Sequence, residues 1–119
     1  MSRRRPALKP IRCLVVLLLL VPPWGAAAGE DVWTEVERVV AIGDVHGDYD
    51  QLMALLRSAA LIDAEGKWSG GKTHLVQTGD LLDRGPDSRK AMELFMRLEE
   101  EARTAGGEVH VLIGNHEAM

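Results

Sequence analysis

Three stretches of the chain share one pattern, and this pattern limits the fold more than any other feature. In VAIGD, VQTGD and VLIGN, which end at residues 44, 80 and 115, an apolar run leads into glycine and then into a side chain whose oxygen can bind a cation. Each apolar run is short, continuous and closed by glycine, as in a buried strand. The sequence therefore predicts strands over residues 38–44, 73–80 and 108–114.

The segments between these strands have helical periodicity. In both of them, apolar residues recur at positions i, i+3, i+4 and i+7: Leu52, Leu55, Leu56 and Ala59 in the first, and Ala91, Leu94, Phe95 and Leu98 in the second. Asp87 or Ser88 is the expected N-cap of the second helix. The predicted order is βαβαβ, so we expect an α/β fold with parallel strands and right-handed crossovers.

Polar side chains gather after each predicted strand. The carboxyl ends of parallel strands face one crevice, where open α/β sheets bind ligands. The residues brought there are Asp44 and His46, then Asp80, Asp83 and Arg84, then Asn115, His116 and Glu117. Carboxylates placed this close repel one another unless a cation neutralises them. One Gly-Asp pair is a common turn, but three strand ends of the same kind predict a shared metal site.

The ligand types narrow the chemistry of this site. Asp, His and Asn without Cys are the ligands of divalent metals that prefer oxygen and nitrogen, such as Mn, Fe or Zn. Two such metals that share a carboxylate commonly serve in-line attack on phosphorus. The residue pattern alone therefore favours phosphate ester chemistry.

The motifs themselves point to a family. GDVHGD, GDLLDRG and GNHE, in this order and separated by helices, resemble the metal-binding motifs of phosphoprotein phosphatases within the calcineurin-like metallophosphoesterases. The W-x-G-G turn at residues 68–71, the LVQTGDLLDRG block and the Met119 that follows GNHE after one residue are most similar to Shewanella-like protein phosphatases. The resemblance runs from about Val39 to the last residue.

This resemblance implies a set of metal ligands. Asp44 and His46 would hold the first of two divalent metal ions, Asp80 would bridge both ions, and Asn115 would bind the second. The metals implied are Mn, Fe or Zn. The family completes the second metal site with two histidines from later loops and adds a phosphate-binding arginine there, and no residue after Met119 supplies them. We therefore expect residues 29–119 to be the N-terminal βαβαβ half of the family's α/β sandwich, truncated from a longer protein.

The resemblance also implies catalytic roles. His116 would be the general acid that protonates the leaving oxygen, Asp83 would accept a hydrogen bond from its ring, and Arg84 would bind the phosphate oxygens. The expected reaction is hydrolysis of a phosphorylated protein or a small phosphoester by a hydroxide that bridges the metals. The phosphorylated residue expected is serine, threonine or tyrosine. Two alternatives remain: a nucleotide phosphodiesterase or dinucleoside polyphosphate hydrolase of the same fold, and a non-catalytic metal-binding module.

The first 28 residues have the layout of a secretory signal peptide. Residues 1–13 carry five basic residues and no acid, residues 14–21 are an unbroken apolar run, and small residues lead to a cleavage site after Ala28. A retained membrane anchor is the alternative, but a spanning helix needs roughly 20 apolar residues. Arg4 and Arg5 also fit a twin-arginine signal, although Ala7 occupies the position of the usual aromatic residue. We expect export to the periplasm or the extracellular space, without stable membrane insertion after cleavage.

The charge of the remaining chain excludes some partners. Residues 29–119 keep 9 Lys and Arg against 18 Asp and Glu, a net charge of about −9, which argues against binding to nucleic acid or anionic membranes. The one cysteine, Cys13, lies in the predicted signal, so we expect no disulfide and no thiolate chemistry in the mature chain. His74 and His110 fall near strand starts, away from the predicted site, and are expected to be structural.

Overall fold

A computed structural model describes residues 32–119 of the chain. Its elements, in order, are β1 (Val39–Ile42), α1 (Tyr49–Ser58), β2 (His74–Gln77), α2 (Ser88–Thr104), β3 (Glu108–Val111) and α3 (Asn115–Ala118). The predicted signal peptide of residues 1–28 lies outside the described residues. Within residues 32–119, no helix has the length and apolar character needed to span a membrane.

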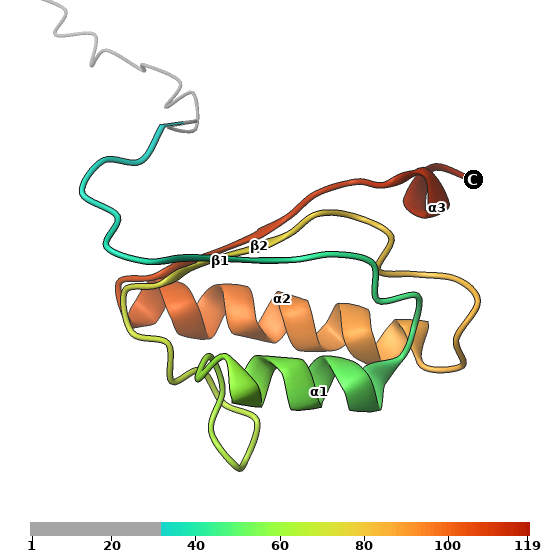
Figure 1. Cartoon of the computed structure of the whole chain (residues 1–119), viewed down its shortest axis with the longest axis horizontal. Helices are drawn as coiled ribbons and strands as arrows, with labels where there is room; N and C mark the ends of the chain where they lie inside the picture. Colours follow the sequence, from blue (N-terminus) through green and yellow to red (C-terminus); the bar gives the residue numbers. More distant parts are fainter. Residues whose placement is uncertain (1–31) are drawn as a thin grey trace, which may run out of the picture. The chain divides into compact units, whose positions relative to one another are not determined.

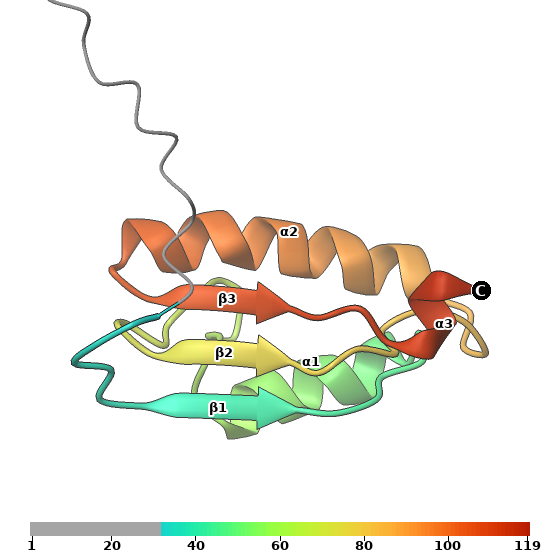
Figure 2. The ribbon, with the colours of Figure 1, turned by 90° about the horizontal axis from the view of Figure 1, so that it is seen from above.

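The three strands form one parallel sheet in the order β1-β2-β3, which confirms the predicted α/β arrangement (Figure 2). Val40 is paired with Leu75, and Leu75 is paired with Val109. The strands are shorter than predicted, because the hydrogen-bonded pairing of each strand stops before the glycine that closes its apolar run. At that point the buried side chain of Gln77 bonds to backbone atoms, donating to the carbonyl oxygens of Gly43 and Gly79 at 3.2 and 2.6 Å and accepting from the Gly79 N–H at 2.9 Å.

Helix α1 begins three residues before the first residue of its predicted apolar stripe. Asp48 is its N-cap and accepts a hydrogen bond from the Gln51 N–H at 3.1 Å. Leu52 and Leu56 are fully buried, as their spacing predicts, whereas Leu55 is 46% exposed. The stripe that reaches the core is therefore narrower than the sequence pattern indicated.

Helix α2 carries the larger apolar stripe. Its buried residues are Ala91, Leu94, Phe95, Leu98 and Ala102, so the predicted stripe is confirmed and continues for one more turn. Asp87 occupies the N-cap position but its side chain makes no capping bond; it forms an ion pair with Lys90 at 2.7 Å instead. The residues that follow Thr104 end the helix and lead directly into β3, which packs against α2.

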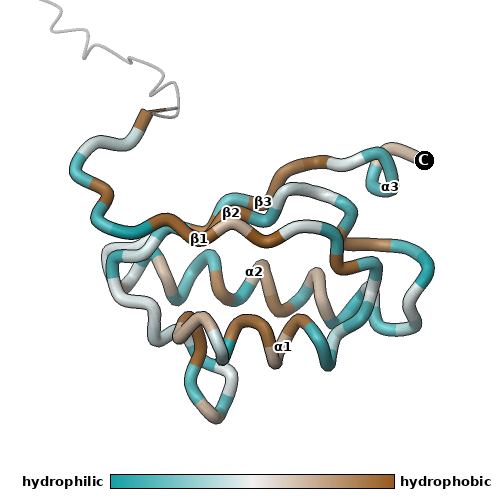
Figure 3. Tube along the Cα trace, viewed as in Figure 1, coloured by the Kyte–Doolittle hydropathy of each residue, from teal (hydrophilic) through white to brown (hydrophobic). Residues whose placement is uncertain are grey.

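Both long helices cover the same face of the sheet (Figure 1). Apolar and hydrophilic residues alternate along each of them, as expected for helices with one buried side (Figure 3). The buried core lies between these helices and the sheet, and its largest members are Phe95, Leu52, Leu56, Leu61, Leu75 and Leu98.

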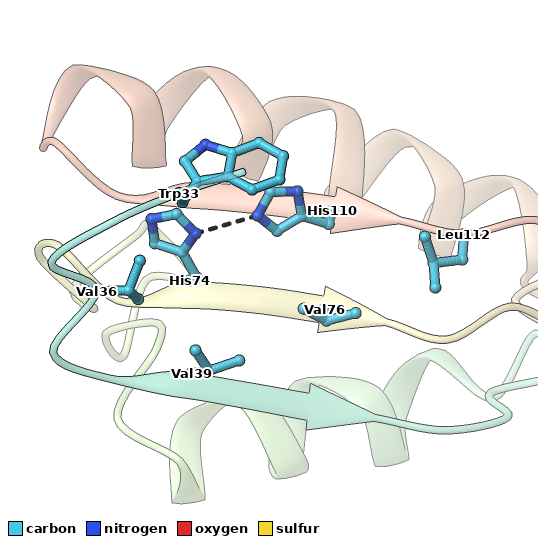
Figure 4. Close-up of a pocket in the computed structure, with 7 residues that line it drawn as sticks. All are labelled: Trp33, Val36, Val39, His74, Val76, His110 and Leu112. Atoms are coloured by element: carbon cyan, nitrogen blue, oxygen red, sulfur yellow. Dashed lines mark hydrogen bonds between the residues drawn. The ribbon is translucent and has the colours of Figure 1, made fainter. Parts of the chain in front are cut away.

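The opposite face of the sheet carries Trp33, His74 and His110 (Figure 4). The ring centroids of Trp33 and His110 are 4.5 Å apart, and His74 Nδ1 lies 3.2 Å from His110 Nε2. Both histidines are half-buried. His74 begins β2, as predicted, whereas His110 is the third of the four residues of β3.

Candidate metal centre

The loops that follow β1 and β2 are joined by backbone hydrogen bonds beyond the end of the sheet. The N–H groups of Val45 and His46 both donate to the Asp80 carbonyl oxygen at 3.0 Å, and the Gly47 N–H donates to Leu81 at 2.9 Å. The Gly85 N–H donates back to the His46 carbonyl oxygen at 2.6 Å. The first two predicted site loops therefore lie together, as their position at neighbouring strand ends required.

The side chain of Glu117 joins the loops that follow β2 and β3. Its Oε1 accepts the N–H groups of Leu81 and Leu82 at 2.7 and 3.0 Å, and its Oε2 accepts those of Asp80 and Gly114 at 2.7 and 2.8 Å. Partial burial raises the pKa of the Glu117 carboxyl, but the four N–H groups outweigh burial and lower the pKa from 4.5 to about 2. Glu117 is therefore an anion over the whole physiological range.

Three side chains from the three loops meet at this edge. His46, Asp80 and His116 each offer one metal-ligating atom, and these atoms all lie within 4.8 Å of one another. His46 Nδ1 lies 3.3 Å from the Leu82 carbonyl oxygen. Because a carbonyl can only accept, Nδ1 carries the proton and the lone pair of Nε2 is left for a cation. Asp44 Oδ2 lies 3.4 Å from that same Nε2, so the predicted ligand Asp44 lies beside His46 but is not one of the three groups that meet within 4.8 Å.

The side-chain amide of Asn115 lies beside the carboxylate of Asp80. With its NH₂ group toward Asp80, it donates hydrogen bonds to Oδ1 and Oδ2 at 3.2 and 3.1 Å. The structure therefore brings the predicted ligand Asn115 next to Asp80.

His116 is held on two sides. Its ring Nδ1 lies 3.0 Å from Asp83 Oδ2, and its backbone N–H donates to Asp80 Oδ1 at 3.0 Å. The His116 side chain is only 8% exposed, and its ring meets the ring of His46 edge to face at 4.6 Å. The pKa of the Asp83 carboxyl is lowered, first by the hydrogen bond from the Arg84 N–H and then by the one from His116. A carboxylate bonded to Nδ1 leaves Nε2 of His116 for the site.

Arg84 lies at the rim of the site. It is exposed, and it lines an open cleft together with His46, Gly47 and Gly85. Four residues of the predicted site have left-handed backbone conformations: His46 (φ 49°), Asp80 (φ 54°), Asp83 (φ 70°) and Arg84 (φ 70°). Such conformations are costly for residues other than glycine and gather where function requires them.

Sequence reasoning placed Glu117 at the site but gave it no role. Its place three residues after Gly114 is the spacing of a capping box, in which the acidic side chain reaches back to the N-cap N–H. That signal could have predicted the bond to Gly114. The bonds to residues 80–82 could not be foreseen, because they join the ends of different strands. The short helix α3 was also missed, since four residues are too few to show a helical period.

Comparison with known proteins gives consistent matches. The calcineurin-like phosphoesterase family model matches residues 37–119. Shewanella-like protein phosphatase 2 of Arabidopsis thaliana is 46% identical over 83 residues, which make up 70% of this chain and 21% of that protein. A symmetrical bis(5'-nucleosyl)-tetraphosphatase of Cronobacter sakazakii is 37% identical over 76 residues, 64% of this chain and 22% of that protein.

A solved structure gives the same picture. The crystal structure of a cold-active protein-tyrosine phosphatase from a psychrophilic Shewanella species superimposes with a TM-score of 0.69 at 46% sequence identity. The aligned part covers 71% of this chain and 25% of that one. The chain thus spans about a quarter or less of the length of these relatives.

Proposed function

The chain belongs to the calcineurin-like phosphoesterase family, and from this premise we propose that it contributes part of the active site of a metal-dependent phosphomonoesterase. The observation that carries the proposal is the meeting of His46, Asp80 and His116 within 4.8 Å, one residue from each of three strand-end loops. Its relatives are phosphatases and hydrolases, and its fold is the N-terminal part of the family's α/β domain.

The residues divide into metal ligands and groups that act on the substrate. Asp44 and His46 would hold one cation, Asp80 would bridge two, and Asn115 would hold the second. Bound divalent cations would lower the pKa of water and neutralise the charge on the phosphate. The identity of the metals, Mn, Fe or Zn, is open in this proposal. The support for a two-metal arrangement is that Asp80 lies near both predicted partners: its ligating oxygen is within 4.8 Å of His46, and its carboxylate oxygens are 3.1 and 3.2 Å from the Asn115 amide.

His116 would supply the proton that the leaving oxygen needs. Asp83 bonds to Nδ1 at 3.0 Å, which would fix the ring and leave Nε2 to face a bound ester. Histidine is the side chain that most often serves as a general acid or base. Arg84, exposed beside His46, would hold two phosphate oxygens with its planar guanidinium.

The proposed substrate is a phosphorylated serine, threonine or tyrosine of a protein. The presence of Arg84 directly after Asp83, and of Glu117 after His116, favours the protein phosphatase branch over a nucleotide phosphodiesterase. A dinucleoside polyphosphate hydrolase is the second candidate, because a relative with that name is 37% identical to the chain.

The test is to compare Mn-dependent hydrolysis of an aryl phosphate, phosphopeptides and dinucleoside tetraphosphates by the intact protein. Preference for phosphopeptides is expected, and preference for the dinucleotide would establish the second candidate. Arg84→Lys should weaken phosphomonoester turnover roughly 10-fold or more, because charge-assisted hydrogen bonds are lost. Arg89→Lys is the control, since Arg89 lies on α2 and, within residues 32–119, pairs only with Glu93.

We also propose that residues 1–28 direct export of the protein. The support is the order of basic, apolar and small residues in that segment. The mature protein recovered from outside the cytoplasm should begin at Gly29. Recovery with the N-terminus intact would reject the proposed cleavage.

A further inference from the structure

We propose that Glu117 is the positioning residue of the metal centre: its carboxylate sets the distance between the loop that carries Asp80 and the loop that carries Asn115 and His116. This inference rests on the proposed function, because it assigns a task in building that same site. Glu117 itself is not proposed as a metal ligand or as a proton donor.

Hydrogen bonds run between the two loops in both directions, and we call this pair of contacts, made by Glu117 and Asp80, the clamp. A single oxygen atom of Glu117, Oε2, contacts both loops: it accepts one N–H from Asp80 at 2.7 Å and one from Gly114 at 2.8 Å. The side chain of Asp80 returns the contact, because its Oδ1 accepts the N–H of His116 at 3.0 Å. Each loop thus supplies a carboxylate that binds the backbone of the other. The side chains that would ligate metal start from this fixed frame.

The second loop requires such a partner. The N–H groups of Asp80, Leu81 and Leu82 converge on one carboxylate, which is the geometry of an anion-binding backbone nest. Asp80 also has a φ of 54°, a conformation that persists only where the surroundings hold it. Without an anion in the nest, the backbone of residues 80–82 would lose the three hydrogen bonds that its N–H groups make to Glu117. Glu117 therefore acts on the metal through Asp80.

The chemistry of the clamp requires a carboxylate of this length. Each oxygen of Glu117 accepts two N–H groups, and an amide offers only one oxygen. In Glu117→Gln, the NH₂ group would face two N–H donors, either those of Asp80 and Gly114 or those of Leu81 and Leu82. Glu117→Asp would keep the charge but withdraw it by one methylene.

A matched control exists at the other end of the molecule. Glu101 is also a partly buried carboxylate that joins two segments, since it accepts the Trp68 N–H at 2.7 Å and pairs with Arg97 at 2.7 Å. It lies on α2 and touches none of the three loops of the site. Glu101→Gln should therefore lower stability without affecting metal binding.

The experiment is titration of the metal-free intact protein with Mn²⁺ by calorimetry, well below the unfolding temperature of each variant. Glu117→Gln should bind Mn²⁺ about 10- to 100-fold more weakly, as is typical when a residue that orients a metal ligand is lost. Its turnover of aryl phosphate should fall at limiting Mn²⁺ and recover when Mn²⁺ is in excess. Glu101→Gln should keep the affinity and the turnover of the unchanged protein.

Each result has one reading. Mn²⁺ affinity of Glu117→Gln within about twofold of the unchanged protein overturns the positioning role. Failure of the unchanged protein to bind any of Mn²⁺, Fe²⁺ and Zn²⁺ rejects the proposed function instead, so the two failures differ. If Glu117→Gln does not fold, Glu117→Asp takes its place: weaker Mn²⁺ binding by the folded variant supports the role, and unchanged binding overturns it.

Discussion

Gly79→Ala should damage the site without changing any proposed ligand. The loops after β2 and β3 lie close together at Gly79 and Gly114: a Cβ atom on Gly79 would lie 2.6 Å from the Gly114 nitrogen and 2.7 Å from its Cα. These neighbours are backbone atoms, so the contact cannot be relieved by turning a side chain. Gly79 also has a φ of 102°, which L-residues rarely adopt.

The expected cost follows from these two features. The backbone conformation costs alanine about 1–3 kcal/mol, and an added methyl group that forces a backbone shift costs about 1–3 kcal/mol more. The sum is about 2–6 kcal/mol, which is a large part of the roughly 5–15 kcal/mol by which small domains are stable. Gly79 and Gly114 directly precede Asp80 and Asn115, so a shift of the backbone there would also change the distance between these two proposed ligands. Mn²⁺ affinity should therefore drop together with stability.

Gly43→Ala is the matched control, because Gly43 has the same place in the motif after β1. A Cβ on Gly43 would meet no atom within 4 Å, and its φ is not in the left-handed range. Alanine there should leave the free energy of unfolding within about 1 kcal/mol of the unchanged protein, on the stabilising side, because it restricts the unfolded chain. The measurement is urea unfolding of the intact protein followed by circular dichroism. Equal midpoints for the two variants would refute the close approach of the loops.

Three further predictions concern the side chains of the site. His116→Asn should reduce turnover of aryl phosphate by roughly 10² to 10⁴ while metal content, measured by elemental analysis, is kept; loss of metal would make His116 a ligand instead of the acid. Asp80→Asn should lose both metal and activity, because the bridge requires a charged carboxylate, and full metal content would reject that role. The depressed pKa of Glu117 should stabilise the metal-free protein fully above about pH 4.5, and up to about 3 kcal/mol of this stability should be lost as the pH falls toward 2. Acid unfolding of Glu117→Gln is the comparison, and an equally steep loss in that variant would assign the effect to other groups.

The helices and strands could be predicted from the hydrophobic periodicity of the sequence, but their exact ends and the contacts between them could not. Leu52 and Leu56 are buried as their spacing required, but Leu55 is 46% exposed, because the helix pattern does not say how far the sheet extends beneath each side of the stripe. The predicted strand ends lie up to three residues beyond the observed ones. The sequence does not show that the side chain of Gln77 bonds to backbone groups at the point where the strands end. Its bonds to Gly43 and Gly79 depend on the neighbouring strand and on the turn that follows.

For the same reason, the sequence predicts which polar residues lie near the strand ends but not the contacts that hold their loops together. Side chains that can ligate a metal are recognised in a sequence by their residue type. The groups that hold the loops bind backbone N–H and carbonyl groups instead, and these are the same in almost every residue. Gln77 satisfies the carbonyl of Gly43, the Asp80 carbonyl satisfies the N–H groups of Val45 and His46, and Glu117 satisfies the N–H groups after β2. Polar backbone groups that leave a ladder must find partners. Because backbone and supporting side chains provide these partners here, the contacts that hold the loops depend on the fold and cannot be recognised from residue type.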